Sequence, residues 1–234
     1  MARDEFDRDL GHLEAEVVLL GGLVENAIFS ALGALASRDL ERSKRVIIED
    51  DRIDDKEADI ENSCIDLIRR EAPIAGDLRR IVAVLLIASE LERMGDYAEG
   101  IAKISLLMGN EPPLKELVDI PRMGELSVSM LKRSLESFLE RDPETSVKLA
   151  RSLGPDDDKV DALYEQVQKD LLALMKENPD NVDRATYLLW AAHNMERIAD
   201  RATNIAERAI FQATGMKVNV DDGDRVREAL ASTQ

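Results

Sequence analysis

Acidic residues spaced four positions apart are the part of this sequence best suited to chemistry. Two such pairs occupy corresponding places in both halves of the chain: Asp50 with Asp54 and Glu92 with Asp96 in the first, and Asp157 with Asp161 and Glu196 with Asp200 in the second. On a helix this spacing puts both carboxylates on one face, where like charges repel by about 0.2–0.5 kcal/mol. If the helices of one half pack side by side, four carboxylates meet. Such an all-oxygen set suits hard or borderline cations, so we expect these eight residues to bind metal ions.

Solvated surface charge is the competing interpretation of any single pair. Charged residues make up 34% of the chain, and Arg93 or Arg197 could form a salt bridge with the neighbouring acid. Metal binding is favoured because the pairs occur at corresponding places in both halves. A helical scaffold without metal stays open as an alternative.

The chain contains two copies of one unit. Residues 91–103, LERMGDYAEGIAK, align with residues 195–207, MERIADRATNIAE, at an offset of 104 positions. Residues 50–68 align with residues 157–175 at an offset of 107 positions, and this alignment superimposes the remaining acid pairs. Offsets that differ by only a few residues indicate a duplication with loops of unequal length.

Each copy is predicted to form three long helices. Apolar residues at helical spacing predict helices over residues 6–35, 40–68 and 78–108 in the first copy, and over 123–139, 144–176 and 182–213 in the second. Asp39, which aligns with Asp142, and Asp77 are the expected N-caps of the second and third helices. The insertion that contains Gly154 and Pro155 predicts a kink or break in the middle helix of the second copy.

The expected fold is all-α, with two tandem, similar three-helix bundles. Apolar residues of the middle helices recur every seven positions, which is typical of near-parallel bundle packing, and short connections make neighbours antiparallel. We expect the first bundle over residues 1–112, the second over 113–215 and a C-terminal tail over 216–234. The tail is expected to hold one short helix near residues 225–231 or to be disordered, and its sequence suggests no function.

Composition and charge exclude several classes of function. Lys and Arg number 31 against 48 Asp and Glu, and this net charge of −17 repels nucleic acid and anionic membranes. The single Cys64 cannot form an internal disulfide and is expected in the core, and the charged N-terminus is unlike a signal peptide, so we expect a cytoplasmic protein. The longest apolar run, residues 81–89, covers about half the length that a bilayer requires, so no membrane-spanning segment is expected.

The sequence contains no recognisable catalytic motif. It has no Gly-rich phosphate loop, no Ser-His-Asp set and no Cys-x-x-Cys. Di-iron bundles need Glu-x-x-His, whereas His193 precedes Glu196 in the reverse order, so redox catalysis is not expected. We expect His193 to be partly exposed and Trp190 to pack inside. A carboxylate–metal hydrolase stays as an alternative, although few side chains could bind its substrate: Arg93, Lys103, Arg197 and Asn204.

Several of these segments together resemble the PhoU family. They are LERMGD and MERIAD, the preceding APIAGDLRR at residues 72–80, and the Asp-x-x-x-Asp elements. The resemblance extends to about Gly215 and implies a PhoU-like fold of two bundles with long antiparallel helices, as in spectrin. It further implies that the acid pairs supply ligands to multinuclear metal sites, often of iron, with Zn, Mn or Mg possible. Those ligands are Asp50, Asp54, Glu92, Asp96, Asp157, Asp161, Glu196 and Asp200.

The resemblance also implies a role. Members of the family report phosphate sufficiency, contact the ATPase subunit of the phosphate ABC transporter and a membrane sensor histidine kinase, and have no established catalysis. We therefore expect a cytoplasmic, homodimeric, non-enzymatic regulator of phosphate uptake and starvation signalling that reaches the membrane only through its partners. A similar accessory protein of another phosphate or ion permease is the alternative. Two departures concern the site: Ala199 replaces Gly95 in the second copy, and the Gly154–Pro155 insertion closely precedes Asp157.

Overall fold

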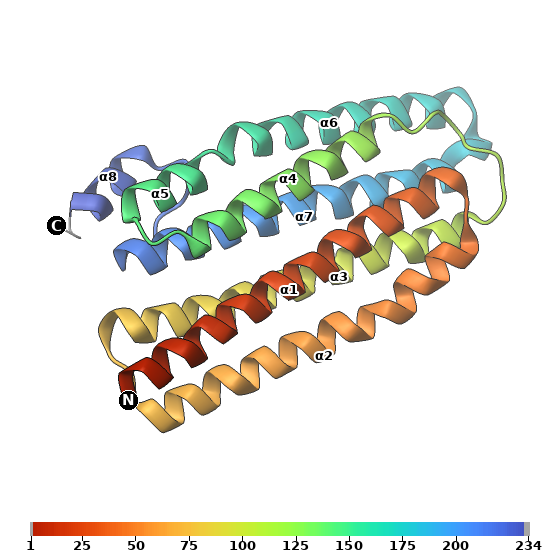
Figure 1. Cartoon of the computed structure of the whole chain (residues 1–234). Helices are drawn as coiled ribbons and strands as arrows, with labels where there is room; N and C mark the ends of the chain where they lie inside the picture. Colours follow the sequence, from red (N-terminus) through yellow and green to blue (C-terminus); the bar gives the residue numbers. More distant parts are fainter. Residues whose placement is uncertain (1, 232–234) are drawn as a thin grey trace.

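The computed structural model of the chain describes residues 2–231, and these residues form α-helices and one short 3-10 helix, with no strand among them (Figure 1). The elements are α1 Ala2–Ser37, α2 Leu40–Glu71, α3 Ala75–Met108, α4 Asp119–Leu139, α5 Pro143–Arg151, α6 Gly154–Glu177, η1 Pro179–Asn181, α7 Val182–Thr214 and α8 Gly223–Ala231. The all-α prediction is confirmed, and each predicted helix is present with its ends displaced by a few residues. The short helix expected in the tail is α8.

The predicted N-cap Asp39 is confirmed, and its counterpart Asp142 has the same role in the second copy. The carboxylates of Asp39 and Asp142 accept hydrogen bonds of 2.9 Å from the backbone N–H groups of Arg42 and Thr145, so equivalent aspartates cap α2 and α5. The prediction for Asp77 is wrong. α3 begins at Ala75, and Asp77 lies inside its first turn, where a negative charge interacts favourably with the positive end of the helix dipole.

The predicted break in the middle helix of the second copy is confirmed. α5 ends at Arg151 and α6 starts at Gly154, with Pro155 in its first turn. Because proline lacks a backbone N–H and its ring clashes with the preceding turn, the α5 hydrogen-bond ladder cannot continue through this point. α5 and α6 together therefore occupy the place that α2 alone occupies in the first copy.

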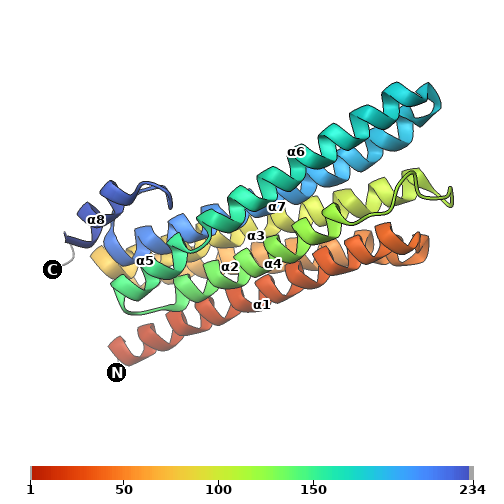
Figure 2. The same ribbon diagram turned by 90° about the horizontal axis from the view of Figure 1, so that it is seen from above.

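Two bundles of long helices lie side by side (Figures 1 and 2). α1, α2 and α3 pack on one another, α4 to α7 do the same, and α3 and α7 run antiparallel where the two bundles meet. The core is aliphatic, and Cys64 is fully buried in it, as predicted. The limits of the two bundles at residues 112 and 215 stay a prediction.

The interface between α3 and α7, called the seam below, contains two equivalent contacts, one toward each end. Glu90 Oε2 accepts hydrogen bonds of 3.1 Å from Arg201 Nη1 and 3.2 Å from Asn204 Nδ2. At the other end of the seam Asn194 lies against Gly100, where an added Cβ would be 2.7 Å from Asn194 Nδ2. The offset of 104 converts Glu90 to Asn194 and Gly100 to Asn204. The two contacts are thus equivalent, and a pseudo-twofold axis crosses the seam between them.

α1 is long and apolar enough to cross a membrane by length and composition alone, with a mean hydropathy of 1.8 in its most apolar window. The uninterrupted apolar runs of this helix are short, because Glu25 and Asn26 divide its apolar residues. In the fold α1 packs against α2, α3 and α4 and buries residues such as Val17 and Val24 completely. The core helix of a folded protein can pass the same test, and 44% of that window of α1 is buried in this structure.

Candidate metal centre

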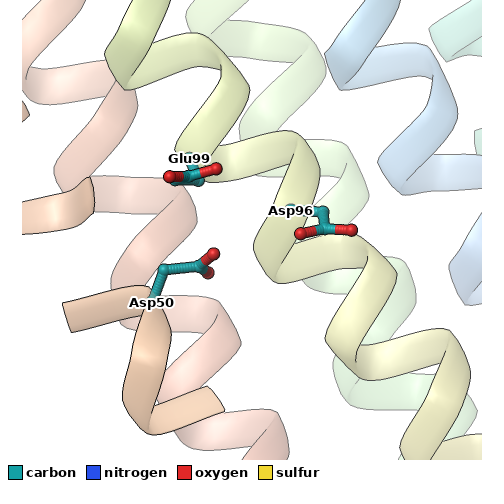
Figure 3. A group of neighbouring side chains, drawn as sticks. All are labelled: Asp50, Asp96 and Glu99. Atoms are coloured by element: carbon teal, nitrogen blue, oxygen red, sulfur yellow. The ribbon is translucent and has the colours of Figure 1, made fainter. Parts of the chain in front are cut away.

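The first acidic cluster lies where α2 and α3 pack together. Asp50 on α2 and Asp96 and Glu99 on α3 each place one carboxylate oxygen within 4.8 Å of the other two, and Figure 3 shows the Asp50 side chain extending toward α3, which carries Asp96 and Glu99. Asp50 is buried, Glu99 is half-buried and Asp96 is exposed. The cluster is therefore open to solvent on one side and walled by the bundle on the other.

The remaining predicted residues of this copy continue the same strip of charge. Burial, followed by the charges of Asp96 and Asp54, raises the pKa of Glu92. Burial, followed by Asp54 and Glu99, raises the pKa of Asp96. Each of the four predicted carboxylates of the first copy is thus close enough to at least one of the others for the two charges to repel.

Asp50 carries the largest electrostatic cost in this cluster. Burial, then the charges of Glu99, Asp54 and Asp96, raises its pKa to about 7, and only Lys103 opposes the shift. Among the described residues no hydrogen bond stabilises its charged form. A buried carboxylate that is surrounded by acids and lacks a donor is an environment that a bound cation would neutralise.

Glycine at position 95 allows α2 and α3 to approach closely at this point. A Cβ there would lie 3.0 Å from two carbons of the Ile53 side chain and 3.1 Å from Asp50 Oδ1. These distances are shorter than ordinary van der Waals contact. The second copy has Ala199 at the equivalent position, so its helices meet under a different constraint.

The second acidic cluster lies between α6 and α7. Burial, then Asp161, Asp200 and Asp221, raises the pKa of Asp157 to about 6, and the Thr203 hydroxyl opposes the shift. Glu196 Oε2 is buried, accepts no hydrogen bond and lies 3.4 Å from Nδ1 of His193. The four predicted carboxylates of the second copy therefore also share one strip.

One carboxylate of this strip, that of Asp200, forms an ion pair with an arginine, as the alternative interpretation of surface charge pairing predicts. Arg197 Nη1 donates a hydrogen bond of 2.6 Å to Asp200 Oδ2. Arg197 and Asp200 are three positions apart on α7 and both are half-buried, so the pair satisfies one of the four carboxylates without a cation. Within residues 2–231 no arginine or lysine forms an ion pair with Asp157 or Asp161, and the pKa values of both carboxyls are raised rather than lowered.

The two clusters differ at two positions that the repeat pattern did not reveal. Glu99 of the first copy aligns with Thr203, and Glu57, whose pKa is raised by burial and by Glu61 and Asp54, aligns with Tyr164. Within residues 2–231, three acidic ligand atoms that are all within 4.8 Å of one another occur only in the first cluster. The first cluster is the denser of the two. Its spacing of three residues from Asp96 was the signal that could have identified Glu99.

The sequence also predicts how far two side chains of α7, His193 and Trp190, are exposed. His193 is 53% exposed, as expected, and its ring centroid lies 6.0 Å from that of Tyr164. The prediction that Trp190 packs inside is wrong, because 50% of it is exposed and its ring contacts Tyr187 edge-on at 5.8 Å. Trp190 lies on the outward side of α7, whereas the inward side is filled by alanines and branched aliphatic residues.

Comparison with known proteins assigns the chain to a family. Residues 17–105 and 120–209 each match the family model for the PhoU domain, so both acidic clusters lie within matched segments. The chain belongs to the PhoU family. Its relatives include PhoU homologues described as phosphate-specific transport system accessory proteins, and solved structures share the same fold.

Identities with these relatives extend over nearly their full lengths. The homologue from Clostridium acetobutylicum is 35% identical over 95% of this chain and 100% of its own length, and that from Aquifex aeolicus is 41% identical over 89% and 92%. The crystal structure of the phosphate transport system regulatory protein PhoU from Streptococcus pneumoniae matches with a TM-score of 0.82 at 33% identity, covering 92% of this chain and 99% of that one. PhoU from Pseudomonas aeruginosa matches with a TM-score of 0.84 at 30% identity, covering 90% and 100%.

Proposed function

We propose that this PhoU-family chain is a non-catalytic cytoplasmic regulator of phosphate uptake and of the phosphate-starvation response. It contacts the ATPase subunit of the phosphate ABC transporter and a membrane sensor histidine kinase, works as a homodimer and reaches the membrane only through its partners. The proposal is supported by full-length similarity to proteins named phosphate-specific transport system accessory proteins. Long rigid helices and a net charge of −17 favour partners with basic surfaces.

Metal binding by the two acidic clusters is the second part of the proposal. The buried Asp50 carboxylate, which has acids around it and no donor, is the observation that carries it. Asp54, Glu92, Asp96 and Glu99 complete the first set of ligands, and Asp157, Asp161, Glu196 and Asp200 form the second. Multinuclear iron is our first choice, followed by Zn²⁺, Mn²⁺ and Mg²⁺, because carboxylates discriminate poorly among these ions. The bound charge would remove the repulsion within each strip and so hold α2 on α3 and α6 on α7.

Recovery of partners from membrane fractions tests the regulatory role. The tagged chain is incubated with membranes from phosphate-rich and phosphate-starved cells, and we expect the transporter ATPase subunit or the sensor kinase among the retained proteins. Retention of neither under both conditions contradicts the proposal. Retention of a different permease supports the alternative of an accessory protein for another ion.

Elemental analysis of protein purified without chelator tests the metal centres. We expect metal in the wild-type chain and clearly less in the variant Asp50→Asn/Asp96→Asn. Asp66→Asn is the matched control, because Asp66 lies on α2 but its carboxylate pairs with Arg69 in solvent. A wild-type chain that is free of metal, and that binds none on titration, contradicts this part of the proposal. Phosphate-ester hydrolysis that is lost in the double variant would instead support a hydrolase.

A further inference from the structure

Two guanidinium groups from different parts of the chain hold the buried carboxylate of Glu14 on α1. Arg80, near the start of α3, donates a hydrogen bond of 2.9 Å to Glu14 Oε1. Arg141, which follows α4, donates hydrogen bonds of 3.0 and 2.5 Å to Oε1 and Oε2. Because guanidinium–carboxylate hydrogen bonds are charge-assisted, this arrangement satisfies the acid and both cations together.

Both arginines recur at equivalent positions of the other copy. The aspartate N-caps of α2 and α5 align at an offset of 103 positions, and the residues that precede them are Arg38 and Arg141. At the offset of 104 that relates α3 to α7, Arg80 aligns with Arg184. Arg38 lies in the turn between α1 and α2, and Arg184 lies at the start of α7. That turn and that helix start are at the same end of the molecule (Figures 1 and 2).

Contacts between α1 and α4 show that the offset of 103 also holds in space. A Cβ added at Gly21 would meet the side chain of Leu135, and a Cβ added at Gly124 would meet that of Leu32. The offset converts Gly21 to Gly124 and Leu32 to Leu135, so the two contacts are equivalent. The pseudo-twofold axis therefore relates the surroundings of Glu14 to those of Arg38.

The acid itself has no counterpart. The residue that aligns with Glu14 is Leu117, which precedes α4 because this helix begins only at Asp119. The Leu117 side chain packs against the apolar core. The equivalent site therefore keeps both arginines, Arg38 and Arg184, but not the carboxylate that they would hold.

Arg38 and Arg184 both contact the chain that follows α3. Arg38 Nη1 lies 3.2 Å from the sulfur of Met108, which is a weak acceptor, and Arg38 Nε is buried without a hydrogen-bond partner among residues 2–231. Arg184 donates to the Pro112 carbonyl, and its Nε lies 3.4 Å from Oε2 of Glu111. Since Met108 and Pro112 are four positions apart, these contacts make the two guanidinium groups neighbours.

The charge of this arginine pair is poorly balanced. Burial, followed by the charge of Arg184, lowers the pKa of Arg38, and only Glu111 opposes the shift. At the equivalent site the hydrogen bonds to Glu14 raise the pKa of Arg141 instead. The Glu111 side chain is 65% exposed, and an ion pair in solvent contributes little. The pair can therefore accept a further negative charge, and solvent reaches it on the side of Glu111.

We propose that Arg38 and Arg184 bind a small dianionic oxyanion of the phosphate type, which takes the place that Glu14 takes at the equivalent site. Guanidinium forks match the oxygens of such an ion, and two positive charges are balanced by a dianion. A free ligand must also offset the freedom that it loses on binding, which favours a dianion over a single carboxylate. The bound ion joins the turn after α1 to the start of α7. This inference is independent of the proposed metal centres and of the regulatory role.

Phosphate titration of the full chain tests the inference. The protein is first treated with chelator, because phosphate could otherwise bind through metal ions. Isothermal titration calorimetry at low ionic strength then measures the affinities for inorganic phosphate, sulfate and acetate. We expect phosphate and sulfate to bind, and acetate to bind more weakly by about tenfold or more, since it carries one charge. Absence of phosphate binding, or equal affinity for acetate, overturns the inference.

Single substitutions locate the bound ion. Arg38→Gln and Arg184→Gln should each weaken phosphate binding by about tenfold or more, because each removes charge-assisted hydrogen bonds. Glu111→Gln should strengthen phosphate binding by roughly two- to fivefold, because a competing carboxylate is gone. Arg69→Gln is the matched control: it makes the same change in net charge on α2, where Arg69 pairs with Asp66 in solvent, and should keep the wild-type affinity.

Thermal melts with and without phosphate separate a binding role from a structural one. If Arg38→Gln and Arg184→Gln lower the melting temperature but keep the wild-type rise with phosphate, the two arginines only stabilise the fold and the inference is wrong. Equal weakening of phosphate binding by Arg69→Gln shows a general effect of charge and also overturns it. Glu111→Gln keeps both guanidinium groups, so it decides the question even if an arginine variant does not fold. Unchanged phosphate affinity in Glu111→Gln contradicts the inference.

Discussion

The carboxylate of Glu14 on α1 and the guanidinium of Arg141, which follows α4, join the two bundles. Arg141 Nη1 and Nη2 donate hydrogen bonds of 3.0 and 2.5 Å to the two Glu14 oxygens, and Arg80 from α3 donates to Oε1 at 2.9 Å. Burial raises the pKa of Glu14, but the bonds from Arg141 and Arg80 outweigh burial, so the net shift is downward. This buried carboxylate is therefore held charged by one residue from each copy.

Glu14→Gln should destabilise the chain at neutral pH. The buried carboxylate is 3% exposed and its loss leaves two guanidinium groups without an anion, so we expect a cost of about 2 kcal/mol, or roughly 4–8 °C in melting temperature. Because the native pKa is lowered, this contribution is complete above the ordinary glutamate value of 4.5 and is lost as the pH falls through the lower native pKa. Thermal melts at pH 7 and pH 3 measure both effects. Asp66→Asn, which breaks an exposed pair, is the control; an equal shift in both variants contradicts the prediction.

The stability of the metal-free protein should fall as the pH rises from 5 to 8. Asp50 has an ordinary pKa of 3.8 and a native pKa of about 7, so between these values the folded state holds a proton that the unfolded state has released. Raising the pH removes this proton at a cost of at most about 4 kcal/mol, by the 1.4 kcal/mol that each pKa unit represents. Chemical unfolding in chelator at several pH values measures the slope. Asp50→Asn should flatten it, and an unchanged slope in that variant would refute the assignment to Asp50.

The first cluster should bind Mn²⁺ more tightly than the second, because Glu57 and Glu99 are replaced by Tyr164 and Thr203. Exchanging one of these positions provides a matched test. Glu99→Thr should weaken the tighter site, and Thr203→Glu should strengthen the weaker one, each by roughly tenfold, since carboxylate count tunes cation affinity. Isothermal titration calorimetry resolves the two sites. Opposite signs from those stated, or no change in either variant, would show that the two clusters do not differ in this way.

Gly95→Ala should weaken metal binding with little change in stability. Alanine is favoured over glycine inside a helix by about 1 kcal/mol, but its Cβ would press on Ile53 and on the Asp50 carboxylate at 3.0–3.1 Å. These effects oppose each other in folding, whereas displacement of Asp50 acts only against the cation. We expect affinity at the first cluster to fall about fivefold. The reverse exchange, Ala199→Gly, should lower stability and leave the second cluster's affinity unchanged; a loss of affinity there as well would mean that the substitution acts through general loosening.

The helices, and the eight paired acids as candidate ligands, could be predicted from the sequence because each pattern occurs in both copies of the duplicated unit. A helix pattern or an Asp-x-x-x-Asp that occurs in both copies is distinguished from the many other charges of a chain that is 34% charged. The same rule hid Glu99, since its counterpart is Thr203, although its place three residues after Asp96 put it on the same face of α3. A residue such as Glu99, which occurs in one copy alone, is not marked out by the repeat.

The other misses have tertiary causes. The short connection between Glu71 and Ala75 folds α3 back on α2. The helix therefore begins at Ala75, and Asp77 lies inside its first turn. Trp190 is exposed because bundle packing fills the inner side of α7 with small residues, and a helical pattern that is apolar on several sides does not state which side faces the core.

The axis that relates Glu90 and Asn204 to Asn194 and Gly100 runs across the seam, with α2 at one outer edge of the molecule and α6 at the other (Figure 1). The two acidic strips, one in each copy, therefore lie in opposed directions on a single polypeptide. A protein that itself contains two identical subunits can align its own symmetry with this axis and meet both strips with the same surface. A partner with a single copy of that surface would bind only one strip at a time. The difference in carboxylate number, with Glu99 in one strip and Thr203 in the other, would determine which strip it binds.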